Sequence, residues 1–235
     1  MKEFRLLEAE EIEARISTCT AKGVSILLYK DARCDMNILD ETVGPMNWQR
    51  YHSRDNANCI VSIWDENKER WIDKEDTGTE SFTEKEKGLA SDSFKRACFN
   101  WGIGRELYTA PFMWVNAAHL KTLEDRNGKW TCRDAFEVTA IEYIDRHICY
   151  VKIKNLKSGL EHEFGTPKTD KQKQDEIAKQ TISAVKLNAL LARCKSEGVS
   201  TAKIEKLYNV KDLAELTEKQ YANINQFWGK IKEAE

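Results

Sequence analysis

Two adjacent cations, Lys95 and Arg96, are the residues whose types and spacing best suit binding chemistry. The segment 81–101 around them has apolar residues at helical spacing, so we predict a helix there. On a helical wheel the two cations lie about 100° and 200° from Phe94, outside the apolar stripe. Lysine offers a point charge and arginine a planar fork, so the pair could hold successive phosphate groups. The alternative is an ordinary solvated helix face, with Asp92 pairing with Arg96 one turn along.

A second group mixes aromatic and cationic residues upstream of that helix. Its members are Trp48, Tyr51, Trp64 and Trp71 with Arg50, Arg54 and Arg70. Single-stranded nucleic acids are bound by such mixtures, because bases stack on rings while cations hold the backbone. Aromatic residues of a half-buried sheet are also ordinary core residues, so both interpretations stay open. We keep Arg50 as a candidate binding residue.

Other kinds of site lack their signatures. The seven Cys and four His are scattered without a CxxC pair, which argues against a zinc site and favours reduced thiols. No Ser-His-Asp or Cys-His arrangement can be identified from the sequence. Gly102-Ile103-Gly104 follows a predicted helix rather than a strand, and no Lys-Ser/Thr follows it, so we interpret it as a helix exit. We expect no cofactor, no metal and no enzymatic activity.

Composition sets the class of protein. The 235 residues include 37 Lys+Arg, 39 Asp+Glu and seven Trp, with a net charge of −2. This balance excludes a disordered tail, and no apolar run approaches the roughly 18 residues of a membrane span. The acidic start is unlike a signal peptide, so we expect a cytoplasmic protein with no membrane partner. Near-neutral charge gives no support for a nucleic-acid partner, although a few cations on one helix face could still form a site.

The predicted elements indicate an α+β protein with three segments. Helices are expected at 5–22, 34–43, 81–101 (capped by Ser81 or Thr83) and 117–123. Strands are expected at 24–30, 47–52, 58–64, 70–78, 135–144, 147–155 and 159–165. We expect those at 47–52, 58–64 and 70–78 to form an antiparallel meander. We predict a core domain at 1–165, a polar linker at 166–176 and a small helical domain at 177–235.

The C-terminal segment carries clear helix boundaries. Its predicted helices are 177–197 closed by Gly198, 200–208 closed by Asn209, and 217–232. Thr217 and Gln220 have the spacing of a capping box. Together these helices predict a small bundle.

The ordered motif LASDSFKRACFNWGIGRELY (89–108) resembles the helix signature of the Rad-fifty-two/Rad-twenty-two type single-strand annealing proteins, especially the phage Sak group. The shared features are an acidic residue, Lys-Arg-Ala, an aromatic-Gly pair and the Gly-Ile-Gly-Arg-x-Leu-Tyr run. Upstream, ILDETVGPMNWQRYH (38–52) resembles the family segment that ends in Asn-Trp. Residues 111–114 and the strands of 135–165 resemble the phage branch. The resemblance covers about residues 5–165.

This resemblance implies a curved antiparallel sheet packed on the long Lys-Arg helix, and assembly into rings or filaments. It implies ATP-independent binding of single-stranded DNA, phosphates inward and bases exposed, and annealing of complementary strands in phage recombination and DNA repair. Lys95 and Arg96 match the phosphate-contacting pair of the family, and Lys87 matches a basic residue eight positions earlier. Arg33 and Arg105 are weaker candidates for the same groove.

The resemblance also implies partners for the chain, and alternative functions stay open beside it. The helical segment 177–235 is similar to appendages that recruit a host single-strand-binding protein or a phage exonuclease, and the host bacterial cytoplasm is the expected location. A passive stabilising role or a second DNA contact is the alternative for this segment. For the whole chain, the alternative function is coating of single-stranded DNA or RNA without annealing.

Overall fold

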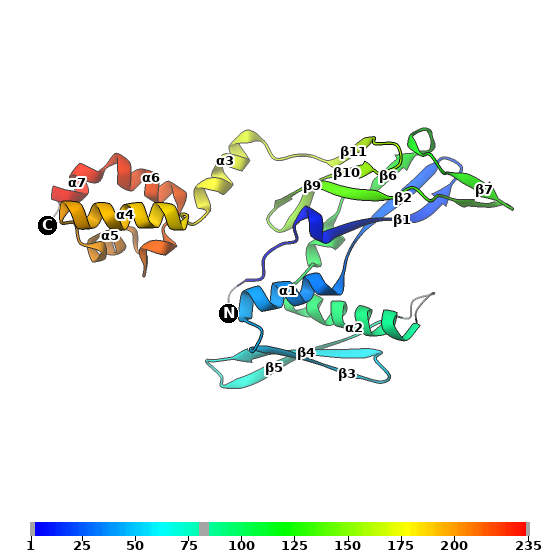
Figure 1. Cartoon of the computed structure of the whole chain (residues 1–235), viewed down its shortest axis with the longest axis horizontal. Coiled ribbons are helices and arrows are strands. Elements are labelled where there is room, and N and C mark those ends of the chain that lie inside the picture. Colours follow the sequence, from blue (N-terminus) through cyan, green and yellow to red (C-terminus); the bar gives the residue numbers. More distant parts are fainter. Residues whose placement is uncertain (1–2, 80–84, 234–235) are drawn as a thin grey trace. The chain divides into compact units, whose positions relative to one another are not determined.

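The computed structural model describes residues 3–79 and 85–233, without the side chains of 85–87. The chain is a mixed α+β protein of two compact units, Met1–Pro167 and Lys168–Glu235 (Figure 1). Both sheets with more than two strands belong to the first unit, and the second is helical. Each unit has its own hydrophobic core.

The larger sheet of the first unit has six antiparallel strands in the order β11-β10-β9-β1-β2-β6. They are β1 (Ile12–Thr20), β2 (Gly23–Lys30), β6 (Met113–Asn116), β9 (Phe136–Ile144), β10 (His147–Asn155) and β11 (Glu161–Gly165). β9 and β10 are joined by Asp145 and Arg146, whose positive φ angles of 48° and 64° suit a tight hairpin turn. β2 pairs with β1 on one side and β6 on the other, which matters for the site below.

A smaller sheet and two helices complete the core of this unit. The sheet is the predicted meander, with β3 (Trp48–Ser53), β4 (Asn58–Asp65) and β5 (Arg70–Thr77) in sequence order. The helices are α1 (Ala32–Val43) and α2 (Lys85–Trp101), and β7 (Glu124–Arg126) pairs with β8 (Lys129–Thr131). Short 3-10 helices span Ala9–Glu11, Arg105–Thr109 and Ala117–His119.

Helix α2 packs on β4 and β5 through the apolar stripe predicted for it. Phe94, Ala97 and Cys98 are fully buried, and they share one core with Val61 of β4 and Ile26 of β2. This burial holds the helix in one orientation, so the direction of its other faces is fixed as well.

The predicted helix over 5–22 is wrong, because this segment contains strand β1. Ile12 and Ala14 are buried and alternate with more exposed residues, and Ile12 pairs with Lys30 across the hairpin. A four-residue spacing such as Ile12 to Ile16 fits both a helix and a strand, since four is also a multiple of two. The β-branched residues and pairing with β2 and β9 decide for the strand.

The C-terminal unit has more breaks than predicted. Its helices are α3 (Asp170–Lys179), α4 (Ala184–Glu197), α5 (Thr201–Tyr208), α6 (Glu218–Gln226) and α7 (Trp228–Glu233), with a 3-10 turn at Leu213–Glu215. The single helices predicted over 177–197 and 217–232 are therefore each interrupted. Ser183 caps α4 with its side chain, and Ile182 N donates to Leu216 O at 2.8 Å, so the chain is extended between α3 and α4. Part of the predicted linker 166–176 lies in α3.

The remaining predictions have mixed outcomes. Strands at 24–30, 135–144, 147–155 and 159–165, the helix at 34–43 and the capping box of Thr217 and Gln220 are confirmed. The helix expected at 117–123 is only the 3-10 turn Ala117–His119. The predicted caps Ser81 and Thr83 lie outside the described residues. Within the described residues, no helix has the length and apolar character needed to cross a bilayer.

Candidate functional site

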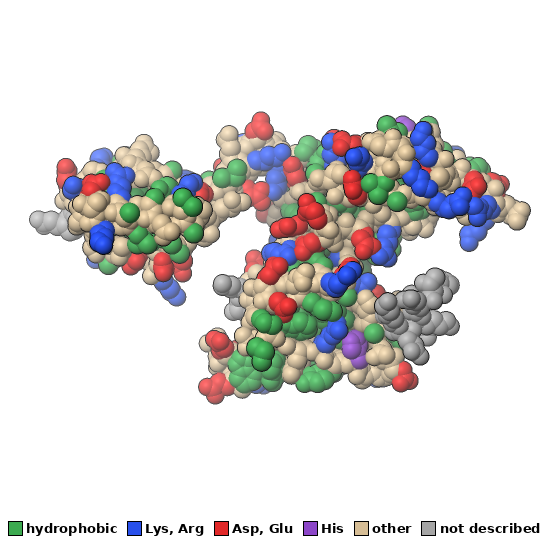
Figure 2. Space-filling view, in the orientation of Figure 1, with side chains coloured by type: hydrophobic (Ala, Val, Ile, Leu, Met, Phe, Trp, Pro, Cys, Tyr) green, Lys and Arg blue, Asp and Glu red, His purple; other side chains and the backbone are tan. Residues whose placement is uncertain are grey.

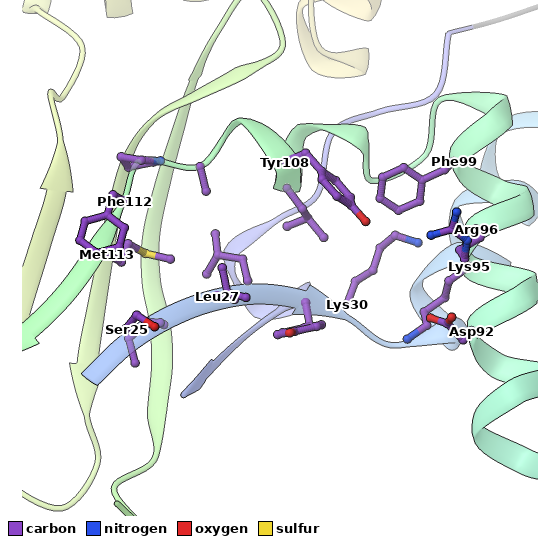
Figure 3. A pocket seen from close by; sticks show the side chains of 16 residues that line it. Ser25, Leu27, Lys30, Asp92, Lys95, Arg96, Phe99, Tyr108, Phe112 and Met113 are labelled. Carbon is purple, nitrogen blue, oxygen red and sulfur yellow. The ribbon is translucent and has the colours of Figure 1, made fainter. Parts of the chain in front are cut away.

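A cavity of about 540 Å³ opens in the first unit between β2, the C-terminal half of α2 and residues 107–113. Lys95 and Arg96, the pair singled out by the sequence, both line it. Figure 3 shows them extending from α2 at one end, with Phe112 and Leu27 toward the other end and Tyr108 between. The cavity therefore has a cationic end and an apolar end.

The apolar stripe of α2 positions the two cations. Phe94 and Ala97 are fully buried on either side of them in the sequence, so the helix turns Lys95 and Arg96 away from the core. The side chain of Arg96 is 46% exposed, and its Nε lies 3.4 Å from Oδ1 of Asp76 on β5. An exposed pair of this length adds little stability, so a ligand can displace Asp76 at small cost.

The alternative partner for Arg96, Asp92, is engaged elsewhere. Oδ2 of Asp92 accepts hydrogen bonds from the backbone N of Thr79 at 2.8 Å and from its Oγ1 at 3.2 Å. Within the part of the chain that the structure describes, Lys95 forms no ion pair. Asp92 lines the cavity too and offsets part of its positive charge, but the charge of Lys95 is not neutralised by direct contact.

A buried ion pair lies beneath the cationic end. Lys30, at the end of β2, is 3% exposed and donates a hydrogen bond to Asp35 of α1, which is fully buried. Lys30 Nζ also lies 5.5 Å from the centre of the Phe99 ring. Gly104, at φ 77°, lies against this lysine, because a Cβ there would be 2.1 Å from Lys30 Cε. The pair holds a third cation at the cavity wall.

The environment of Asp35 perturbs its ionisation. Burial raises its pKa to about 6, against the opposing attraction of Lys30 and, more weakly, Lys95. Its second oxygen, Oδ2, has no hydrogen-bond partner within the described structure. The sequence motifs did not reveal this pair, although Val24, Ile26 and Leu28 alternate as the inward residues of a strand on which Lys30 is the next inward position. That alternation was the available signal.

The aromatic residues of the cavity were also missed. Tyr108 is 78% exposed and Phe112 is 80% exposed, while Phe99 is half-buried. The rings of Phe99 and Tyr108 meet edge to face, with centroids 5.1 Å apart. Exposed aromatic residues beside cations are a usable signal, but the sequence does not say which aromatics stay exposed.

The other predicted cations lie in different environments. Arg105 lines a neighbouring hollow instead, and it donates to the backbone oxygens of Phe99 at 2.5 Å and Asn100 at 2.9 Å, at the end of α2. Arg33 is exposed on the first turn of α1 and pairs with Asp31, which raises the pKa of the arginine. Neither is among the residues that line the cavity.

The two remaining candidates are Arg50 and Lys87. Arg50 on β3 packs over the Phe94 ring, with its Cζ 4.5 Å from the ring centre, outside the cavity lining. Lys87 lies on α2, but its side chain is outside the described part of the structure. The cavity therefore brings together Lys95 and Arg96 from the predicted set, and adds Lys30.

The upstream aromatic group divides between two environments. Trp48 stacks on Phe94 at 6.2 Å, and its Nε1 donates to Asp40 at 2.6 Å, so it belongs to the packing of α1 and α2. Trp64 and Trp71 meet edge to face at 5.6 Å, whereas Tyr51 is 56% exposed. For Trp48, the interpretation as a core residue is the better one.

Charges of both signs are interspersed on the face shown in Figure 2. A cationic site on this protein therefore has to be local.

All seven cysteines are free, and no cluster of three or more metal-ligating side chains occurs among the residues that the structure describes. Burial raises the pKa of the Cys98 thiol, which keeps it protonated beside Asp35. The cations and exposed rings of the site are suited to binding an anion with an apolar part.

Comparisons with known proteins identify no relative. No protein-family model matches the chain, and neither any curated protein nor any solved structure matches it.

Proposed function

We propose that this protein binds single-stranded DNA and anneals complementary strands without ATP, as a member of the Rad-fifty-two/Rad-twenty-two type phage group that its motif resembles. The observation that carries the proposal is the placement of Lys95 and Arg96. They extend side by side from a rigid helix into a cavity that also presents exposed aromatic rings. The finer fold of that group, a curved sheet packed on the Lys-Arg helix, is part of the same proposal.

The two cations would act on the DNA backbone. Arginine can hold two phosphate oxygens with its planar fork, and lysine adds a mobile point charge beside it. Contacts to phosphate carry no sequence information, so binding would be independent of sequence. A second strand could then test its register by base pairing, and base pairing alone would supply the free energy of annealing.

Assembly explains how so small a site could suffice. Among the side chains that the structure describes, three cations line the cavity, one of them paired with buried Asp35. Repeating a modest site around a ring or filament would add the contacts of many subunits to one strand, which raises the overall affinity without a large charge on each subunit. The net charge of −2 would limit binding elsewhere on the surface.

The test is the double substitution Lys95→Ala/Arg96→Ala. Both side chains lie off the buried stripe, so we expect the variant to fold and to lose single-stranded DNA affinity by roughly tenfold or more. Each lost phosphate contact should lower the slope of log affinity against log salt by about 0.7, so the pair should lower it by about 1.4. Fluorescence anisotropy over a salt series measures both, and mixing of complementary oligonucleotides without ATP measures annealing.

The matched control is Arg126→Ala/Lys129→Ala, which removes the same charge from the exposed β7-β8 hairpin. We expect this control to keep the affinity and salt slope of the native protein. Native affinity and annealing in the Lys95/Arg96 variant would contradict the proposal. Tight binding by the native protein without strand pairing would instead favour the alternative function, coating of single strands.

A further inference from the structure

The part of the cavity that runs from Tyr108 to the apolar end presents more exposed ring surface than a folded domain normally leaves uncovered. Tyr108 and Phe112 are 78% and 80% exposed, and Leu27 beside them is 48% exposed. Exposed apolar side chains that gather in one concave place usually mark a binding surface.

Both rings are supported by neighbouring aromatic residues. Tyr108 is held against Phe99 in an edge-to-face contact with an interplanar angle of 89°. Phe112 stacks on Trp114 of β6 with an interplanar angle of 16° and a centroid distance of 6.5 Å. These contacts leave much of Tyr108 and Phe112 open to solvent, as their exposure shows. The rings are therefore partly pre-positioned, which lowers the entropy cost of binding.

We propose that Tyr108 and Phe112 form a stacking platform for nucleobases of the bound single strand, while Lys95 and Arg96 hold the adjoining phosphate. This inference rests on the proposed function and deepens it. The proposed annealing requires only phosphate contacts, with the bases left free. The cavity adds a place where a base is held by its face.

The shape and charge of the cavity favour this occupant. A nucleotide has an anionic end and a flat aromatic end, and the cavity has cations at one end and rings toward the other (Figure 3). A purely apolar occupant would leave Lys95 near its surface without a counter-charge. The volume of about 540 Å³ lies within the usual range for sites of small organic groups. Every base has a flat face, so such a platform would remain independent of sequence.

The test compares two strands of equal length and equal charge. One is oligo-thymidine, and the other carries abasic sites in place of its bases. Stacking on an aromatic side chain changes affinity by roughly tenfold, so the native protein should bind the abasic strand about tenfold more weakly. The variant Tyr108→Leu/Phe112→Leu should bind both strands equally, near the affinity of the native protein for the abasic strand.

Trp130→Leu is the matched control, because Trp130 is a partly exposed aromatic residue of the β7-β8 hairpin, outside the cavity. It should keep the native preference for the strand with bases. Equal binding of both strands by the native protein would overturn the stacking platform but leave the proposed function standing. Binding of neither strand would overturn both. A leucine variant that keeps the preference but changes its oligomeric state by light scattering would show that the rings contact a second subunit, which also overturns the platform.

Discussion

Substitution of Lys30 by Met tests whether the buried ion pair supports the site. Met keeps much of the length of the side chain but removes the charge and the hydrogen bond to Asp35. The carboxyl group of Asp35 then stays buried without the lysine that bonded to its Oδ1. Its other oxygen, Oδ2, has no partner within the described structure even in the native protein. Removing one partner of a buried pair costs about 3–5 kcal/mol, because the other charge is left without compensation.

This cost depends on pH, and the direction follows from Asp35. Burial already raises the pKa of Asp35 to about 6, and Lys30 opposes that rise. Without Lys30 the pKa of Asp35 should rise further. At pH 8 the folded variant must either bury an uncompensated carboxylate or bind a proton at a pH where a solvated carboxyl group is ionised. At pH 5 the buried carboxyl group is already protonated and uncharged. The loss of stability relative to the native protein should therefore be greater at pH 8 than at pH 5.

Thermal unfolding followed by circular dichroism measures the effect. A loss of 3–5 kcal/mol in a unit of this size corresponds to a fall in Tm of about 6–20 °C at pH 8. At pH 5 the expected loss is about 1–2 kcal/mol, the usual contribution of a hydrogen bond with some packing. Urea unfolding at the two pH values gives the free energy of unfolding directly.

Two further variants make the result decisive. Lys30→Met/Asp35→Asn removes both charges and with them the titration of Asp35, so its loss of stability should not be greater at pH 8 than at pH 5. Lys74→Met is the matched control, because Lys74 is a partly buried lysine that bonds to the backbone oxygen of Asn100 at 2.6 Å rather than to a carboxylate. An equal fall in Tm at both pH values for Lys30→Met would refute the reasoning, because the ionisation of Asp35 would then not be the cause of the lost stability.

Two other substitutions separate structural from binding roles. Arg105→Met removes the hydrogen bonds to Phe99 O and Asn100 O, so we expect the free energy of unfolding in urea to fall by about 1 kcal/mol. The salt slope for DNA binding should stay unchanged. A slope that falls would instead place Arg105 among the phosphate contacts. Ser183→Ala removes the side-chain cap of α4 and should cost about 1 kcal/mol, whereas Ser200→Ala should cost less, because Ser200 at the start of α5 forms no such bond. Equal losses in urea unfolding for the two serine variants would contradict the capping argument.

Local patterns were sufficient for much of the fold. The apolar stripe of α2 predicted which residues face the core, and therefore that Lys95 and Arg96 point away from it. The meander β3-β4-β5 and the hairpin β9-β10 follow from alternating residues separated by turn residues. These elements were predictable because neighbouring residues supply most of their signal.

The errors occur where distant residues decide. The spacing of Ile12 and Ile16 fits a helix and a strand equally well, and only the pairing of β1 with β2 and β9 resolves it. Ile182 and Ser183 interrupt a helical pattern because Ile182 bonds to Leu216, more than thirty residues along the chain. No local window contains that partner.

The same distinction applies to the site. The sequence by itself determined a helix that presents Lys95 beside Arg96. Only the tertiary structure decided that Lys30 joins them above a buried Asp35, and that Tyr108 and Phe112 stay exposed in the same cavity. The reason is physical: a helix face depends on residues three and four positions apart, whereas a cavity depends on which strand, helix and loop meet in space.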